Sequence, residues 1–460
     1  MAPVPVDRSA APALGPVPAF TFPGIERHVL PNGLRVRTVE HTSAPVVSMV
    51  MHVEGGSGAD LAPQEGLASL VADMVDEGTG PLNAIDVSDA LARIGGDYDV
   101  DTGPDAIGFT LTTLARFADR GAELLAGLLT RPSLRESDFA RIRQLRIDRL
   151  RQIKDIASAV AERAFLRLLY GQHPYGHAPL GNEGALRAIT LDDVTAFHAD
   201  RFRPSQATIV LAGGIRHAEL LAVAERAFGG WTEPAQQPPV RPPASSIPAE
   251  PTRRRIALVH REAAAQSELR IGHLAASRRT PDYAPLLMMN AILGGQFTSR
   301  VNMKLREEKA YTYGARTSFD WKRGVAPFAL STSVHTASTA AAIADATAEI
   351  ESIRGSRPVT EGEMAHAKAA LTRGYPAGFE TAAQVARAVS QLALYDLPDT
   401  YFSDFVPTVS AVTAEEVMRV AAHYLDPGRL TALVVGDAQV VAESLHDVGF
   451  GDPLELPVQM

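Results

Sequence analysis

Cysteine is missing from all 460 residues of the chain. A disulfide framework and a thiolate metal site are therefore both excluded. No apolar run approaches the roughly 18 residues that a membrane-spanning helix needs, so we expect no membrane span. Basic residues are also too few and too scattered for a nucleic-acid reader, since 44 Lys and Arg stand against 53 Asp and Glu, a net charge of −9. The densest basic run, Arg253–Arg255, follows a proline-rich stretch and indicates a solvated loop.

The first residues lack the features of a secretion signal. Met1–Pro23 is rich in Ala and Pro and has no basic segment followed by an apolar one, so it is not a signal peptide as it stands. It is either the mature start of an exported protein or a plain unstructured tail, and we expect residues 1–24 to form a flexible tail. An apolar content of 46% and a charged content of 21% over 460 residues are typical of a globular protein with two or three domains.

Two segments of the chain match each other at a constant separation of 223 residues. Residues 190–213 and 413–436 each show a helix, a proline turn and a strand that ends in glycine. Each helix starts with a Thr that is followed three residues later by an acid, Asp193 or Glu416, which is the pairing of a capping box. The constant separation indicates two homologous halves, and the seven prolines between residues 231 and 252 indicate a semi-rigid linker. The predicted divisions are a tail at 1–24, an N-terminal domain at 25–231, a linker at 232–252 and a C-terminal domain at 253–460.

Local patterns predict several elements that matter below. Ile25–Glu40 alternates around Pro31-Asn32-Gly33 and predicts a β-hairpin. Residues 64–77 carry apolar side chains at helical spacing, and residues 136–169 predict one long charged helix.

The segment with the most informative pattern starts at Gly294-Gly295. Ser299 is placed to cap a helix that runs toward Arg306, and the aromatic- and Thr-rich residues 311–319 predict a strand that begins close to Tyr313. A guanidinium and a phenol that converge could both donate hydrogen bonds to one oxygen atom, which is what a carbonyl turning into an oxyanion requires. The alternative is an ordinary solvated helix end beside an ordinary strand tyrosine.

The pattern Gly-Gly-x-x-x-Ser-Arg-x-x-x-x-Leu-Arg-Glu, with a Tyr seven residues after the second Arg, resembles the C-terminal half of the insulinase-type (pitrilysin) zinc metallopeptidases. The resemblance assigns the two groups that hold the substrate carbonyl to Arg306 and Tyr313 as catalytic residues. One departure is Ala310-Tyr311, where the family usually has Gly-Leu. The resemblance also implies an α+β fold of two homologous halves, each a mixed, mostly antiparallel sheet packed with helices, that close like a clamshell.

The N-terminal half keeps the spacing of the family's zinc motif but lacks its metal ligands and its catalytic Glu. In the family, two His on one helix face bind zinc and a Glu between them activates water. Gly66–Thr79 matches that frame without a gap, but Ser69 and Asp73 stand at the two ligand positions and Ala72 stands at the catalytic Glu. The third ligand position falls at Arg149, to within about a residue. We therefore expect no metal and no other cofactor in this chain.

The resemblance implies a non-catalytic subunit of a heteromeric zinc peptidase. Its partner would be a homologous subunit that carries the zinc, its substrates would be peptides, and Arg306 and Tyr313 would act across the interface. We expect a periplasmic location, with the cytoplasm as the alternative. Two other hypotheses remain open, namely a catalytically silent scaffold of a larger complex and a peptide-binding module without a catalytic partner.

Other candidate sites are weaker. His173 and His177 are separated by Pro174 and Gly176, which oppose a shared helix face, so we interpret this segment as a structural turn. An autonomous hydrolase that uses Asp73 or Asp76 with another metal lacks a second ligand on the same helix. The aspartates between residues 99 and 105 do not follow the spacing of a calcium loop.

Overall fold

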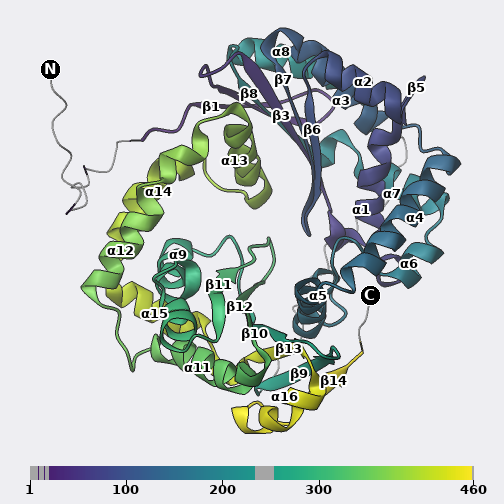
Figure 1. Cartoon of the computed structure of the whole chain (residues 1–460). Coiled ribbons are helices and arrows are strands. Elements are labelled where there is room, and N and C mark those ends of the chain that lie inside the picture. Colours follow the sequence, from purple (N-terminus) through teal and green to yellow (C-terminus); the bar gives the residue numbers. More distant parts are fainter. Residues whose placement is uncertain (1–8, 10–14, 16–19, 234–252, 458–460) are drawn as a thin grey trace.

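The computed structural model describes residues 9, 15, 20–233 and 253–457 (Figure 1). The predicted linker at 232–252 lies almost wholly outside the described residues, as does most of the predicted tail at 1–24. Within the described part, Phe22 is buried against aromatic rings of the C-terminal half. None of the helices in these ranges is both long and apolar enough to cross a membrane.

The N-terminal half is built on a sheet with the strand order β1-β2-β8-β3-β7-β6. Neighbouring strands are antiparallel except for β2 and β8, which are parallel. The predicted hairpin is confirmed as β1 and β2, where Gly33 takes a φ of +91° at the turn. The strands are β1 (Ile25–Val29), β2 (Arg35–Glu40), β3 (Val46–Glu54), β6 (Asp97–Thr102), β7 (Ala106–Leu114) and β8 (Ala207–Gly213), with a separate small pair formed by β4 (Gly78–Thr79) and β5 (Leu82–Asn83).

The C-terminal half repeats this arrangement. Its sheet has the order β11-β12-β10-β13-β9-β14, in which β9, β10, β11, β12 and β13 take the places of β2, β3, β6, β7 and β8. The outermost strand beside β2 or β9 differs, because β1 is the first strand of its half and β14 is the last strand of the other. The predicted mixed, mostly antiparallel sheet in each of two homologous halves is confirmed. The strands are β9 (Arg255–His260), β10 (Gln266–Ala276), β11 (Thr312–Phe319), β12 (Ala326–His335), β13 (Thr431–Gly436) and β14 (Leu454–Leu456).

Helices cover both sheets. Those of the N-terminal half are α1 (Leu67–Met74), α2 (Ala84–Arg93), α3 (Ala118–Thr130), α4 (Glu136–Ile153), α5 (Ala157–Tyr170), α6 (Glu183–Ala188), α7 (Leu191–Arg201) and α8 (His217–Phe228). Those of the C-terminal half are α9 (Tyr283–Asn290), α10 (Arg300–Asn302), α11 (Thr339–Ser352), α12 (Glu361–Thr372), α13 (Ala382–Tyr395), α14 (Tyr401–Ala411), α15 (Ala414–Tyr424) and α16 (Ala438–Leu445). The equivalent helices α7 and α15 both begin with the predicted capping box, at Thr190 and Thr413.

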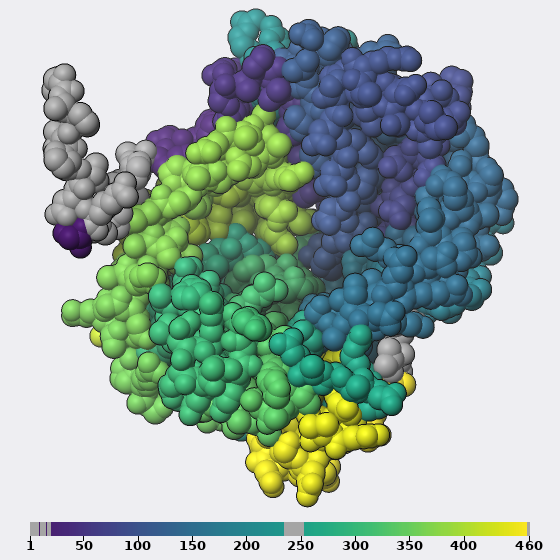
Figure 2. All heavy atoms as spheres, in the orientation of Figure 1, coloured from purple at the N-terminus to yellow at the C-terminus, as the bar shows by residue number. Residues whose placement is uncertain are grey.

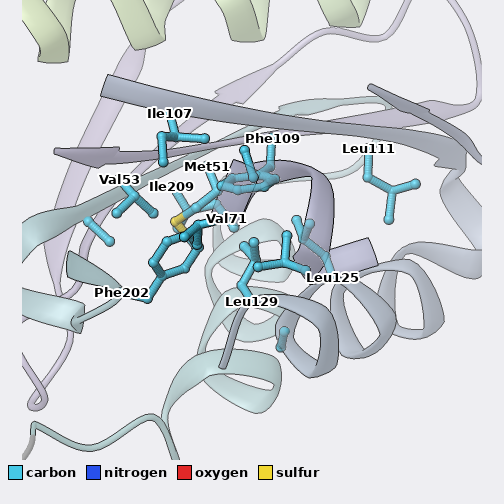
Figure 3. Packing of buried hydrophobic residues seen from close by; sticks show 14 of the residues in the cluster. Met51, Val53, Val71, Ile107, Phe109, Leu111, Leu125, Leu129, Phe202 and Ile209 are labelled. Atoms are coloured by element: carbon cyan, nitrogen blue, oxygen red, sulfur yellow. The ribbon is translucent and has the colours of Figure 1, made fainter. Parts of the chain in front are cut away.

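The core of the N-terminal half lies between its sheet and the helices α1 and α3 (Figure 3). Val71 of α1 and Leu125 of α3 face Met51 of β3 and Phe109 of β7, and all four side chains are fully buried. Burying each such side chain stabilises the fold by roughly 1.5–3 kcal/mol. The helix that carries the family's zinc-motif frame is thus held rigidly against the sheet.

The two halves exchange helices. Val160 and Phe165 of α5 are buried against Val259 and Leu433 of the C-terminal sheet. Conversely, α13 of the C-terminal half packs on the N-terminal sheet, with residues such as Val385 in the same buried cluster as residues of β3 and β8. Each sheet therefore has a helix of the other half on one face (Figure 1). Figure 2 shows a hollow in the middle of the molecule that both halves border.

The prediction of one helix over residues 136–169 is wrong. The helix ends at Ile153, and Ile156 is extended before α5 begins. Arg261 of the C-terminal half donates hydrogen bonds to the carbonyl oxygens of Lys154, at 3.3 Å, and Asp155. The break redirects the chain from the N-terminal sheet to the C-terminal one, and Arg261 satisfies the carbonyl groups that the break releases.

Candidate functional site

The glycine pair at 294–295 lies where a helix runs against a strand. It ends the wide helical turn η7 (Ala291–Gly295), which continues α9. A Cβ on Gly294 would come within 2.4 Å of the Thr317 hydroxyl oxygen on β11, and a Cβ on Gly295 would come within 2.9 Å of the Asn290 amide nitrogen. Real Cβ atoms do not approach other atoms so closely, so this junction requires glycine.

The predicted helix after the glycine pair is present as α10 followed by the wide turn η8 (Met303–Glu308). Wide π-type turns of this kind occur often at functional sites. Ser299 stands at the N-cap of α10 as predicted, but its side chain makes no capping hydrogen bond. Its hydroxyl is buried and has no hydrogen-bond partner among the described residues, and the Ser299 carbonyl instead accepts the Met303 N–H at 2.9 Å.

The two arginines of the motif lie in different environments. Arg300 is buried, and its guanidinium donates to Glu363 at 2.7 and 2.9 Å and to the carbonyl oxygens of Arg357 and Pro358. The side chain of Arg306 is 37% exposed, and its guanidinium carbon lies 4.6 Å from the centre of the Phe297 ring. Arg306 also lines a cavity of about 540 Å³. Arg300 thus has a structural role, whereas the guanidinium of Arg306 has hydrogen-bond donors available to a ligand.

Tyr313 lies at an irregularity in the edge strand β11. The pairing of β11 with β12 shifts between Thr312 and Ala315, which is a β-bulge. Bulges re-aim side chains, and the side chain of Tyr313 is directed into solvent with 88% of its surface exposed. Ala310, just before the strand, has a φ of +54°, a conformation that suits glycine better than alanine. The local backbone thus explains why a glycine is usual at this position in the proteins that the motif resembles.

Asn302 ties the glycine loop, the helix and the strand together. Its side chain is buried, its amide donates to the Phe297 carbonyl at 2.6 Å, and its carbonyl accepts the Ala315 N–H at 3.0 Å. Ala315 is two residues from Tyr313, and Phe297 lies under Arg306. One side chain therefore fixes the backbone on which both predicted catalytic residues depend. That Arg306 and Tyr313 converge on one oxygen atom stays a prediction.

Replacing Asn302 with alanine is expected to lower the free energy of unfolding by about 1–3 kcal/mol, because two buried backbone groups lose their partners. Asn302→Asp is not expected to restore this loss, since a carboxylate accepts from Ala315 but cannot donate to Phe297. Urea unfolding measures the change, with Gln296→Ala in the same loop as the control. Equal stabilities for Asn302→Ala and the control would contradict this role.

On the N-terminal side, α1 is shorter than the predicted helix at 64–77 and covers Leu67–Met74. Its start is fixed by Asp60, a buried carboxylate that accepts the N–H groups of Gly66 and Ala68, both at 2.8 Å. His177 lies 3.1 Å from the same carboxylate, and His173 accepts the Tyr175 N–H at 3.0 Å. Both histidines take part in turn and helix-end contacts, in keeping with a structural turn.

An arginine occupies the space between the two positions that correspond to zinc ligands. Arg146 of α4 is buried, and its guanidinium donates to the Ser69 hydroxyl at 2.8 Å, to the Ser69 carbonyl at 3.3 Å and to the Asp73 carboxylate. The resemblance places the third zinc-ligand position at Arg149. This placement is wrong by one helical turn, because Arg149 is exposed on the outer side of α4. The residue that faces the motif helix is Arg146.

These residues do not fit a catalytic zinc ion. Zinc in peptidases takes three protein ligands of the His and carboxylate type, whereas Ser69 is a poor ligand and Asp73 is already paired with a cation. A guanidinium cannot lose its proton in a protein, so Arg146 can only repel a metal ion. Within the described ranges, no group of three or more His, Cys, Asp or Glu residues is placed to hold a metal ion.

Arg146 could have been recognised from its place in the helix pattern. It stands four residues after Ile142 on the face of α4 that is otherwise apolar and buried. An arginine on a buried face needs a partner, and Asp73 is the polar residue of α1 opposite it.

The carboxyl group of Asp76, just after α1, is perturbed. Burial raises its pKa from 3.8 to about 7, and the neighbouring carboxylates of Glu77 and Asp73 add to the rise, against a lowering by Arg141. Because the pKa in the folded state lies above the unfolded value, the folded protein binds the extra proton. The associated stability is present below about pH 4 and is lost as the pH rises through 7.

Replacing Asp76 with asparagine is therefore expected to stabilise the protein at pH 8 relative to pH 4. The difference in unfolding free energy between the variant and the wild type should grow by about 1–3 kcal/mol over this range. Urea unfolding at both pH values measures it, and Asp97→Asn on the exposed face of β6 serves as the control. A difference that does not change with pH would contradict the shifted pKa.

Comparison with known proteins settles the family. Residues 35–182 match the Insulinase (Peptidase family M16) sequence family, and residues 188–371 match the Peptidase M16 inactive domain. The chain belongs to peptidase family M16. This confirms the resemblance that the motif residues indicated.

Relatives within M16 cover most of the chain. An uncharacterized zinc protease of Mycobacterium tuberculosis is 24% identical over 414 residues, which are 89% of this chain and 92% of the relative. A probable mitochondrial-processing peptidase subunit beta of Schizosaccharomyces pombe is 25% identical over 279 residues, which are 59% of each chain. These relatives place the chain among hydrolases of the M16 type.

Solved structures share the fold. A peptidase M16 inactive domain from Pseudomonas fluorescens superposes with a TM-score of 0.82 at 23% identity, covering 90% of this chain and 98% of that one. A protease from Helicobacter pylori superposes with a TM-score of 0.84 at 19% identity, covering 90% and 99%. The predicted α+β fold of two homologous halves is the M16 fold.

Proposed function

We propose that this M16 chain is the non-catalytic subunit of a heteromeric zinc peptidase, and that it donates Arg306 and Tyr313 to the zinc site of a homologous partner chain. The observation that carries the proposal is the contrast between the two halves. At the zinc-ligand positions a buried guanidinium is bonded to Ser69 and Asp73, whereas the Arg/Tyr segment presents Tyr313 with 88% of its surface exposed.

The arrangement of the C-terminal segment supports this role. Arg306 borders a cavity and Tyr313 extends from an edge strand that has a free outer side. Both residues sit on a backbone that Asn302 and the glycine pair hold in place, so little reorganisation is needed when a partner docks. A relative named as a peptidase subunit adds weight to a subunit role.

In the proposed mechanism, zinc held by the His-x-x-Glu-His motif of the partner would supply the water activated for attack. The substrate peptide lies along an edge strand of the partner. The guanidinium of Arg306 and the phenol of Tyr313 donate hydrogen bonds to the carbonyl oxygen of the bond to be cut. Because these donors meet the oxygen as its negative charge develops, they lower the barrier more than they strengthen substrate binding. The residues around Arg146 take no part in the chemistry and hold α1 against α4.

The test is a peptidase assay with an internally quenched peptide on three samples. These are the purified chain, a purified homologous chain with His-x-x-Glu-His from the same source, and their mixture. We expect cleavage only in the mixture. Chelator-sensitive cleavage by this chain alone would overturn the proposal. A stable complex whose activity does not depend on Arg306 or Tyr313 would instead favour a scaffold.

A further inference from the structure

A cavity of about 540 Å³ is lined by Arg306 and by residues of the C-terminal sheet. Its walls are the glycine loop with Phe297, the turn η8 with Arg306, and the strands β10, β11 and β12. This volume is within the range of roughly 300–1,000 Å³ that is typical of ligand sites.

Arginines dominate the charge of this cavity. Arg270, Arg306 and Arg316 line it, against a single lining carboxylate, Glu268. The strand register places three of the lining residues in one row across the sheet, because Arg316 of β11 is opposite Ser331 of β12, which is opposite Arg270 of β10. Side chains in such a row are about 5 Å from their neighbours, within reach of one bound group.

One of these cations is already neutralised, and two are available. Arg270 is buried, donates to Glu268 at 3.1 Å and to the Leu269 carbonyl at 2.9 Å, and lies 3.6 Å from Glu162. Among the described residues, the guanidinium of Arg306 forms an ion pair with the exposed Glu307, at 3.2 Å, and lies over the Phe297 ring. The side chain of Arg316 is exposed and makes no hydrogen bond or ion pair with any described residue. The cavity is thus lined by one buried, paired arginine, Arg270, and by two arginines that are more exposed, Arg306 and Arg316.

We infer that this cavity binds a carboxylate of the peptide substrate, next to the bond that is cut. Guanidinium groups bind carboxylates through paired, charge-assisted hydrogen bonds, and Ser331 adds a hydroxyl donor at the base of the row. The exposed ring of Phe297 offers an apolar wall for the methylene groups that precede a carboxylate. This inference rests on the proposed function for its position relative to the reaction, since Arg306 would hold the adjacent carbonyl.

A peptide carries carboxylates of two kinds, the side chains of Asp and Glu and the C-terminal group. Both present the same chemistry to the cavity. An acidic side chain makes the site select sequence around the cut, whereas a C-terminal group makes it measure the distance from the end of the peptide. Binding experiments with matched peptides separate the two.

The test measures the binding of fluorescent peptides to the full chain, without a partner. Four peptides differ only in one internal residue or in the terminus: internal Glu with an amidated end, internal Gln with an amidated end, internal Gln with a free end, and internal Lys with an amidated end. We expect one carboxylate peptide, with internal Glu or with a free end, to bind about tenfold or more tightly than the amidated Gln peptide. The peptide that gains this affinity identifies the source of the carboxylate.

The variant Arg316→Glu is expected to abolish this preference and to favour the Lys peptide. Arg149→Glu, an exposed arginine on α4 far from the cavity, makes the same change in net charge and should leave the preference intact. Circular dichroism confirms folding, and Arg316→Gln provides a milder change that should remove the preference without reversing it. Equal binding of the Glu, Gln and free-end peptides, or an unchanged preference in Arg316→Glu, would overturn the inference.

The outcomes also separate this inference from the proposed function. If the chain prefers carboxylate peptides but no partner confers cleavage, the cavity is a carboxylate site and the subunit proposal fails. If the mixture cleaves peptides with Glu and Gln, with free and amidated ends, at equal kcat/KM, the subunit proposal stands and the carboxylate site is wrong.

Discussion

Arg306→Ala and Tyr313→Phe are each expected to lower the kcat of the reconstituted peptidase by about 10²–10³-fold. Each change removes one donor from the carbonyl oxygen at the stage when negative charge develops on it. The donors act on the transition state, so kcat should fall far more than KM rises. Steady-state kinetics of the mixture with a quenched peptide measure both constants. Folding should be unaffected, because Tyr313 is largely exposed and Arg306 is partly exposed.

The same segment provides matched controls. Tyr311→Phe removes a phenol two residues from Tyr313, and Lys309→Ala removes a cation three residues from Arg306. Both residues lie on the turn that joins η8 to β11. These variants should keep kcat within a few-fold of the wild type. Equal losses in the controls and the test variants would show that the segment is needed for docking or shape and not for two particular donors.

Arg300→Ala is expected to have the largest effect on stability, lowering the free energy of unfolding by about 3–5 kcal/mol. The change leaves the Glu363 carboxylate and two main-chain carbonyl groups without the guanidinium that now bridges them. Urea or thermal unfolding of the isolated chain measures the loss. Arg357→Ala is the control, because the side chain of Arg357 is 57% exposed and its pair with Glu349 should contribute less than about 1 kcal/mol.

The Glu363 carboxyl group reports on the same contact. Burial alone would raise its pKa, but hydrogen bonds from Arg300 and Thr360 outweigh burial and lower it from 4.5 to about 2. A lowered pKa means that the charged form is stabilised by folding. The contribution is present above pH 4.5 and is lost as the pH falls toward 2. An Arg300→Ala variant as stable as the Arg357→Ala control would contradict the structural role of Arg300.

Much of the fold could be predicted because its signals are local. The hairpin turn at Pro31-Asn32-Gly33 and the paired capping boxes at Thr190 and Thr413 depend on neighbouring residues alone. The repeat at a constant separation then extended these local signals to two whole halves. The glycine pair at 294 was recognised from its motif, and the structure supplies the reason, a close approach of helix and strand.

The exchange of helices could not be predicted from such signals. The apolar face of α5 has the same periodicity whether it packs on the nearer sheet or on the sheet of the other half. At the break after α4, the released carbonyl groups are bonded by Arg261, which is over 100 residues away in the sequence. The bulge that directs Tyr313 outward likewise arises from the pairing of β11 with β12, not from a residue type at that position.

At the zinc-motif helix, the loss of the metal ligands could be predicted from the sequence, whereas the group that takes their place could not. Ser69, Ala72 and Asp73 indicated the loss of the ligands, because those positions are fixed by an ungapped frame. The residue that takes the place of the metal depends on the rotation of α4 about its axis. The position assigned from the sequence, Arg149, lies one helical turn from the residue observed there, Arg146. The pattern of α4 marks Arg146 as an arginine on a buried face, but its bonds to Ser69 and Asp73 follow only once both helices are placed.

In the proposed function, Tyr313 of this chain reaches the active site of another chain. A photo-reactive benzophenone amino acid placed at position 313 tests it most directly, in a mixture with the zinc-motif partner and a bound peptide inhibitor. After irradiation, mass spectrometry identifies the cross-linked residues. If Tyr313 lies at the zinc site of the partner, we expect links to the bound peptide or to the zinc-motif helix of the partner. Links confined to this chain, in a mixture in which the complex has formed, would contradict it.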